Sequence, residues 1–159
     1  MILVAVGTFI HGFDALVEAA DGAVGELGLT GFAQIGHSRV IPRHLAWERF
    51  LPPSALAARI GGAGLVICHG GIGLLGEAMR AGKPVIAMPR SGRPSRASPA
   101  GDQTALLRRL AERHPIQVCE NPHELGPALR AMLDTGPVRR DYDLGTDIPQ
   151  LLVRFLGGR

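Results

Sequence analysis

Short apolar runs alternate with segments of helical periodicity along most of this chain. The runs are rich in β-branched and aliphatic residues and predict strands. These strands cover residues 1–6, 32–35, 47–51, 65–68, 85–88 and 116–119. Between them, apolar residues recur three and four positions apart and predict helices at 13–27, 54–60, 71–81, 102–110 and 121–133. Strands that alternate with helices are typical of a parallel α/β sheet.

Three segments lie outside this alternation or beyond it. Residues 89–101 combine proline, serine and arginine without an apolar period, so we expect an exposed loop there. Residues 136–146 form a predicted linker, and 147–156 a predicted final helix that packs back on the body. A chain of 159 residues favours one compact domain. We therefore expect a ligand-binding domain at 1–135, with 136–159 as linker and helix of the same domain.

The composition narrows the class of protein. A net charge of +3 is too small to indicate a nucleic-acid partner, and Lys83 is the only lysine among the basic residues. Cys68 and Cys119 each end an apolar run, which predicts buried free thiols and a reducing cytosol. No segment approaches the roughly 20 apolar residues of a membrane span, and Met1 does not open a signal sequence. We expect a cytoplasmic protein.

The most informative segment follows the apolar run at 65–68. It begins His69-Gly-Gly-Ile-Gly-Leu-Leu-Gly-Glu77 and continues as a predicted helix. Glycines let a ligand approach the main chain closely, because no Cβ stands in the way. The start of a helix presents unpaired N–H groups and a partial positive charge, which suit phosphate. Glu77 lies about one turn into the helix, in a position to accept hydrogen bonds from sugar hydroxyls. Together these features predict a nucleotide diphosphate site.

Two other interpretations of the glycines remain open. Gly71-Ile-Gly-Leu-Leu-Gly76 matches the GxGxxG pattern of dinucleotide-binding folds. However, the pattern lies in the middle of the chain, and the next strand ends in Pro89-Arg90 with no acid for an adenosine ribose. Alternatively, the glycines only permit tight packing of strand against helix. Packing alone would require neither His69 before the turn nor Glu77 after it, so we favour the nucleotide site.

Several segments resemble the C-terminal, donor-binding domain of family 28 glycosyltransferases, the MurG-like enzymes. They are Cys68-His-Gly-Gly-Ile-Gly73, Glu77-Ala78, Gly82-Lys-Pro-Val-Ile-Ala-Met-Pro89 and Asp102-Gln103. The start, Val4-Ala-Val-Gly-Thr-Phe9 followed by Phe13-Asp14, resembles the stand-alone members of this group. Those members include the catalytic subunit of the two-part UDP-GlcNAc transferase and bacterial PssE-type exopolysaccharide proteins. The resemblance covers residues 1 to about 133.

The resemblance implies an α/β fold with a Rossmann-like parallel sheet, equivalent to the single C-terminal-type half of a GT-B glycosyltransferase. It implies metal-independent transfer of a hexose-type sugar from a UDP-sugar, with neither cofactor nor metal. The acceptor, lipid-linked or a polysaccharide, would be held by a separate membrane-anchored subunit. Such a partner would bring this chain to the inner face of the membrane.

The resemblance also assigns roles to individual residues. Glu77 would bind the ribose hydroxyls, Gln103 the sugar hydroxyls, and the glycine turn the diphosphate. Gly7 and Thr8 would face the phosphates from the other side of the cleft, and the 50–51 segment would meet the uracil. The candidate nucleotide-sugar-binding residues are Gly7, Thr8, Phe50, Leu51, His69, Gly70, Gly71, Gly73, Glu77, Arg90, Asp102 and Gln103.

Some of these residues have a second interpretation. His69 either donates to a phosphate or is a core histidine bonded to the backbone. Arg90, Arg93 and Arg96 either clamp a diphosphate or lie in a solvated loop. Asp102 is more simply a helix N-cap, and Trp47 a core residue. The spacing of the histidines and cysteines indicates no metal site.

No general base is evident in the sequence, so we expect it on the partner subunit. The competing hypothesis is a non-enzymatic module that binds or senses a UDP-sugar. A third is a fragment of a sugar-nucleotide epimerase, which would need its other domain.

Overall fold

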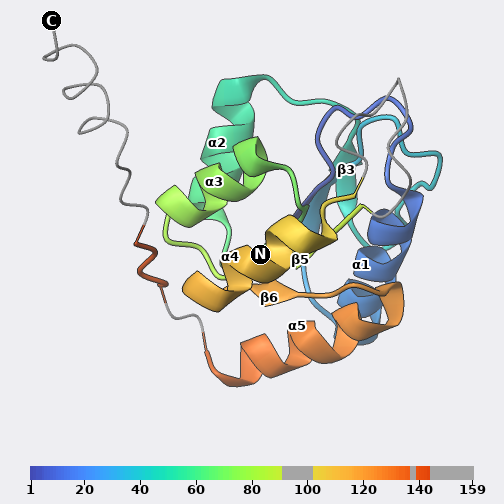
Figure 1. Cartoon of the computed structure of the whole chain (residues 1–159). Coiled ribbons are helices and arrows are strands. Elements are labelled where there is room, and N and C mark those ends of the chain that lie inside the picture. Colours follow the sequence, from blue (N-terminus) through green and yellow to red (C-terminus); the bar gives the residue numbers. More distant parts are fainter. Residues whose placement is uncertain (91–101, 137–138, 144–159) are drawn as a thin grey trace, which may run out of the picture.

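The computed structural model describes residues 1–90, 102–136 and 139–143. Its centre is a six-stranded parallel sheet in the order β3-β2-β1-β4-β5-β6, with helices on both faces (Figure 1). The strands are β1 (Ile2–Ala5), β2 (Gly31–Gln34), β3 (Ala46–Glu48), β4 (Leu65–His69), β5 (Val85–Met88) and β6 (Gln117–Val118). The helices are α1 (Asp14–Glu26), α2 (Pro53–Gly62), α3 (Ile72–Arg80), α4 (Thr104–Arg113) and α5 (Leu125–Asp134), with a 3₁₀ turn η1 (Pro122–Glu124) before α5.

Two apolar layers hold the sheet between its helices. Alternate residues of β1 point to opposite faces, so Val4 packs with α1 and α5 while Leu3 packs with α2, α3 and α4. Figure 1 shows α1 and α5 grouped apart from the other three helices. Because the central strands are buried on both faces, their sequences are continuous apolar runs. The predicted α/β class with a Rossmann-like parallel sheet is confirmed.

Some local predictions are wrong. Trp47 is not a core residue: it lies on the edge strand β3, and 39% of its surface is exposed. Asp102 is not the N-cap of the following helix, because α4 begins at Thr104 and Gln103 is its N-cap. The Asp102 carboxylate lies one residue earlier and accepts the Thr104 N–H at 2.8 Å. The helical segment predicted at 121–133 starts with a capping box between Asn121 and Glu124.

Both cysteines are free and buried, as predicted. Cys68 lies between the sheet and α3, and burial raises the pKa of its thiol to about 12. Burial also raises the pKa of Cys119, to about 11. Neither thiol is therefore ionised near neutral pH in the folded protein.

Residues 139–143 lie against the loop that joins α3 to β5. The Arg140 N–H donates to the Gly82 carbonyl at 3.0 Å, and the Tyr142 hydroxyl donates to the Lys83 carbonyl at 2.6 Å. This part of the predicted 136–146 linker thus packs on the body of the domain. The helix predicted at 147–156 lies outside the described residues. In the part of the chain that the structure describes, no helix is long and apolar enough to cross a membrane.

Candidate functional site

The strand order reverses between β1 and β4, at the centre of the sheet. The chain leaves β1 toward α1 on one face and leaves β4 toward α3 on the other. In open α/β sheets, ligands bind at such a reversal, beyond the carboxyl ends of the strands. The register pairs Ala5 with Cys68, so the turn after β1 and the glycine turn after β4 lie beside each other.

The glycine turn is shaped partly by the protein's own packing. A Cβ on Gly70 would lie 3.0 Å from atoms of Gln103 and Leu107, and one on Gly71 only 2.1 Å from Nε2 of His69. A Cβ on Gly73, by contrast, would meet no atom within 4 Å among the described residues. The packing interpretation therefore accounts for Gly70 and Gly71, but it leaves Gly73 unexplained.

His69 ends β4, and its ring touches both turns. Its Cε1 lies 2.8 Å from the position of a Cβ on Gly7, while Nε2 faces Gly71. Burial, and secondarily the charge of Arg90, lower the pKa of His69 to about 4, although the Ala5 backbone opposes this shift. The ring is therefore neutral at neutral pH. It lies between the two turns, close to both Gly7 and Gly71.

The turn after β1 is held by a residue that the sequence analysis did not single out. Gln34, at the end of β2, accepts the Gly7 N–H with Oε1 at 2.9 Å and donates from Nε2 to the Gly7 carbonyl at 3.0 Å. The N–H of Gly7 is thus used inside the protein. Thr8 is exposed and is the first residue of the turn whose N–H is not held by Gln34.

Arg90 follows β5 on the other side of the glycine turn. Its guanidinium carbon lies 4.0 Å from the centre of the Phe9 ring. This cation–π contact holds the side chain across the switch point, the place between β1 and β4 where the strand order reverses. Its Nη1 is buried and has no hydrogen-bond partner in the described part of the chain. Burial lowers the pKa of this guanidinium, which still remains protonated. A buried cationic donor without a partner is a candidate ligand for an anion.

Gln103 lies beside Arg90 and bonds to its main chain. Gln103 accepts the Arg90 N–H with Oε1 at 3.1 Å, and its own N–H donates to the Arg90 carbonyl at 3.0 Å. Asp102 is exposed, and its hydrogen bonds to Thr104 lower the pKa of its carboxyl. Arg93 and Arg96, the other arginines proposed for a clamp, lie outside the described residues.

The helix α3 begins at the switch point. Gly71 is its N-cap, and no described side chain caps it. The N–H groups in the first turn of a helix have no partner within the helix. Because α3 starts just after β4, its free N–H groups face the space beyond the end of that strand. Glu77 lies farther along α3 with its side chain exposed.

The predicted uracil-contacting segment lies apart from the rest of the candidate site. Phe50 and Leu51 follow β3, which is separated from β1 by β2. The Phe50 ring is 45% exposed and packs edge-on against His37, with 4.9 Å between ring centres. The structure thus brings together the turns after β1, β4 and β5, and it leaves the 50–51 segment on the far side of β2.

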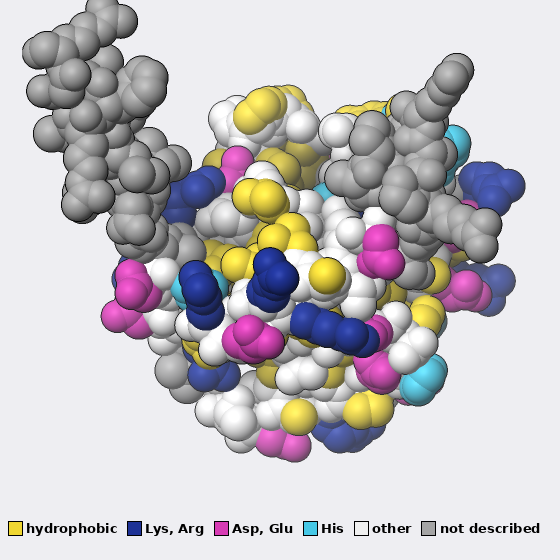
Figure 2. Space-filling view, in the orientation of Figure 1, with side chains coloured by type: hydrophobic (Ala, Val, Ile, Leu, Met, Phe, Trp, Pro, Cys, Tyr) yellow, Lys and Arg dark blue, Asp and Glu magenta, His cyan; other side chains and the backbone are white. Residues whose placement is uncertain are grey.

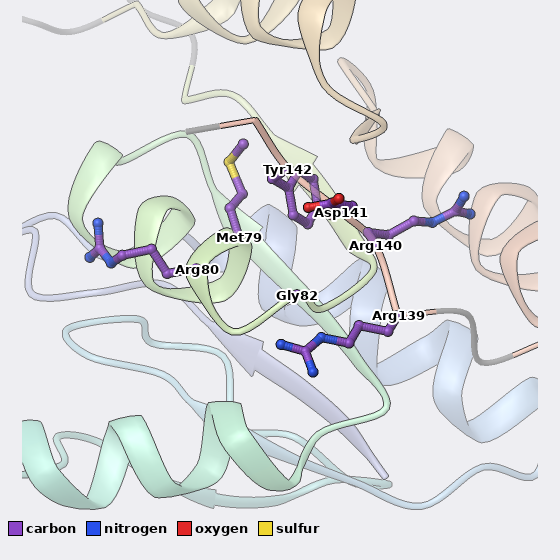
Figure 3. A pocket seen from close by; sticks show the side chains of 7 residues that line it. All are labelled: Met79, Arg80, Gly82, Arg139, Arg140, Asp141 and Tyr142. Atoms are coloured by element: carbon purple, nitrogen blue, oxygen red, sulfur yellow. The ribbon is translucent and has the colours of Figure 1, made fainter. Parts of the chain in front are cut away.

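An open cavity lies elsewhere. It has a volume of about 540 Å³ and is lined by Met79, Arg80, Gly82, Arg139, Arg140, Asp141 and Tyr142. These residues gather where β5 begins, at the opposite edge of the sheet from the glycine turn. Figure 3 shows the side chains of Arg80 and Arg140 pointing away from each other. The cavity contains none of the predicted site residues, and its guanidinium groups do not converge on one point.

Sequence reasoning missed Gln34 and the contact of Phe9 with Arg90. A signal for Gln34 was present, because a glutamine within the apolar run at 32–35 must find hydrogen-bond partners once buried. The partners themselves could not be read from the sequence, since Gly7 and Gln34 are 27 residues apart. Phe9 gave no signal beyond its place in a loop.

No protein-family model matches the chain, and a search of curated proteins found no match. Solved structures do share its fold. MurG from Acinetobacter baumannii is 18% identical with a TM-score of 0.62, and the match covers 98% of this chain and 49% of MurG. The calicheamicin glycosyltransferase CalG4 is 18% identical with a TM-score of 0.61, covering 87% of this chain and 34% of CalG4.

A neighbour of another kind is the molybdenum cofactor binding protein from Rippkaea orientalis. It is 13% identical with a TM-score of 0.54, and the match covers 83% of this chain and 96% of that protein. This chain thus spans from a third to a half of the glycosyltransferases that it matches, while it matches nearly the whole of a smaller binding protein. At these identities the likeness establishes the fold. The chain has the fold of the Rossmann-like half of a GT-B glycosyltransferase.

Proposed function

We propose that this chain is the donor-binding subunit of a metal-independent glycosyltransferase. It would move a hexose-type sugar from a UDP-sugar to a lipid-linked or polysaccharide acceptor, together with a separate membrane-associated acceptor subunit. The observation that carries the proposal is the uncapped start of α3 at the strand-order reversal, with the unpaired Nη1 of Arg90 beside it. Helix N–H groups and a guanidinium suit a diphosphate.

The chemistry follows from where charge develops during transfer. As the bond between the anomeric carbon and the diphosphate breaks, the leaving group becomes more negative and the sugar more cationic. Main-chain N–H groups at the start of α3, the helix dipole and Arg90 stabilise the leaving diphosphate without a metal. Glu77 accepts hydrogen bonds from the ribose, and we propose that Gln103 contacts the sugar hydroxyls. No residue of this chain is assigned as the general base.

The exposed surface around the candidate site supports a partner subunit. Ile10, in the turn after β1, is 63% exposed, and Ile72, at the start of α3, is 70% exposed. These apolar side chains border the donor site from its two sides, where the second half of a GT-B enzyme would stand. We propose that a membrane-anchored acceptor subunit covers them and holds this chain at the cytoplasmic face of the membrane.

Nucleic acid is not a proposed partner. On the face that Figure 2 presents, acidic and basic side chains lie next to each other. Arg108 of α4 and Glu120 form an ion pair, with 2.5 Å between Nε and Oε1. A nucleic-acid-binding surface would instead gather basic residues along one face.

A non-enzymatic module that binds a UDP-sugar remains the second candidate. Its support is the fold match to nearly the whole of the molybdenum cofactor binding protein, which shows that a protein of this size can consist of this fold alone. Both candidates require UDP binding, and they differ in turnover. The enzyme transfers sugar once the acceptor subunit is added, whereas the sensor only binds.

Calorimetric titration tests the shared requirement. UDP is expected to bind more tightly than CDP or ADP, and no binding of UDP at millimolar concentration would refute both candidates. Glu77→Gln is expected to weaken UDP binding by about 1–3 kcal/mol, because a charged acceptor for the ribose hydroxyls is lost. Glu18→Gln, an exposed acid on α1, is the matched control and should leave UDP affinity unchanged. If the unmodified chain, Glu77→Gln and Glu18→Gln bound UDP equally well, Glu77 would not be part of the site.

A further inference from the structure

Gln34 is a buried polar residue at the carboxyl end of β2, with 4% of its surface exposed. Its side-chain amide makes three hydrogen bonds to the main chain of two other segments. Two of them join Gly7, and the third runs from Nε2 to the Arg49 carbonyl at 2.7 Å. One amide group therefore connects the turn after β1 with the end of β3.

The Gly7 main chain, which Gln34 holds, also has close neighbours on two sides. Gly7 has a φ of +71°, a conformation that other residues adopt only with strain. Its Cα faces the His69 ring on one side, and its carbonyl faces Gly36 on the other, where a Cβ would lie 2.5 Å from the Gly7 oxygen. The Gln34 side chain bonds to both the N–H and the carbonyl of Gly7. The direction in which Thr8 leaves the turn is thus fixed from three sides.

The end of β3 is fixed by the same group of residues. The Gly36 N–H donates to the Arg49 carbonyl at 2.7 Å, and Arg49 Nη1 returns bonds to the carbonyls of Gly36 at 3.2 Å and Ser38 at 2.9 Å. The next residue is Phe50, which starts the segment proposed to meet the uracil. Gln34 thereby connects the turn after β1 with the segment proposed to meet the uracil, which lies on the far side of β2.

We propose that Gln34 is a positioning residue for donor binding, which holds the Gly7–Thr8 turn and the Arg49–Phe50 segment at a fixed separation. This inference rests on the proposed function. Glutamine suits the position because one planar group supplies an acceptor for an N–H and donors for two carbonyls. Methionine has a similar shape but supplies neither. A glutamate carboxylate accepts the Gly7 N–H but repels the carbonyl oxygens of Gly7 and Arg49.

The test compares UDP affinity with stability in matched variants. Gln34→Met removes all three hydrogen bonds and is expected to weaken UDP binding at least about tenfold. The control is Asp21→Asn, because Asp21 is also buried and also accepts three main-chain N–H groups, those of Arg43, His44 and Leu45. These three residues precede β3 and so lie at the amino ends of the strands, whereas the candidate site lies beyond their carboxyl ends. Asp21→Asn should lower the melting temperature and leave the affinity for UDP unchanged.

A second variant gives a signature that a purely structural role would not produce. In Gln34→Glu, burial and two facing carbonyls raise the pKa of the new carboxyl, and its protonated form regains an O–H donor. We therefore compare the UDP affinity of Gln34→Glu with that of the unmodified chain at each pH. The ratio of the two affinities should increase as the pH is lowered from 8 to 5.5. Should Gln34→Met fail to fold, this pH dependence decides the question.

The outcomes separate the inference from the proposed function. Equal UDP affinity of folded Gln34→Met and the unmodified chain overturns the inference alone, as does a pH-independent affinity ratio for Gln34→Glu. Absence of UDP binding by the unmodified chain overturns the proposed function and this inference with it. A loss of affinity in Asp21→Asn as large as that in Gln34→Met would show that stability governs binding, and it also overturns the inference.

Discussion

Gly73 gives the sharpest test of a diphosphate at the start of α3. It lies in the first turn of that helix with its surface exposed, and an added Cβ would meet no described atom within 4 Å. The protein's own packing thus has room for alanine. Helix propensity favours alanine over glycine by up to about 1 kcal/mol, and less in the first turn. Gly73→Ala should therefore stabilise the protein by about 0.5–1 kcal/mol and raise the melting temperature by roughly 1–4 °C.

The same substitution should harm ligand binding. A diphosphate that accepts N–H groups of this turn must approach the main chain to hydrogen-bonding distance, where the new methyl group would stand. We expect UDP affinity to fall about tenfold, equivalent to ~1.4 kcal/mol. Thermal unfolding measures the first effect and calorimetric titration the second. Higher stability together with lower UDP affinity in Gly73→Ala would show that ligand binding, and not packing, requires glycine at this position.

Gly22→Ala is the matched control. Gly22 lies in α1, and a Cβ there also meets nothing within 4 Å among the described residues. This variant should be more stable and bind UDP as the unmodified chain does. Unchanged affinity in Gly73→Ala would refute a diphosphate at this helix start. Lower stability of Gly73→Ala would contradict the finding that the added methyl group has no described atom within 4 Å.

Further predictions concern the histidine between the turns and the buried thiols. Gly71→Ala should cost about 1–3 kcal/mol in urea unfolding, because its Cβ would lie 2.1 Å from His69 Nε2; unchanged stability would contradict the position of His69. The folded pKa of His69, about 4, lies below its ordinary 6.5, so the unfolded state binds the extra proton between these values. Stability should fall by roughly 1–3 kcal/mol as the pH drops through this window, and His69→Gln should remove that part of the slope. The thiols of Cys68 and Cys119 should react with a disulfide reagent only at the rate of unfolding, and a rapid reaction in native buffer would contradict their burial.

Much of the fold could be predicted from local sequence, because a strand buried on both faces must be apolar throughout. Glycine at the end of β4 and the capping box at Asn121 are likewise local signals, each set by the main-chain conformation that it permits. Trp47 shows the limit of such signals. A tryptophan in an apolar run is expected in the core, but the order of the strands places β3 at the edge of the sheet, where all three of its residues are exposed.

The sequence by itself determined the alternation of strands and helices, the glycine turn before a helix and the absence of a disulfide pair among its two thiols. Only the tertiary structure decided which glycines serve packing and which has open space before it. It also decided that the Gly7 N–H is held by Gln34 and that Arg90 stacks on Phe9. Periodicity reports whether a residue is buried, because burial depends on the face of its own element. The partner of a buried polar group depends on which strands become neighbours, and that is set by the packing of the whole sheet.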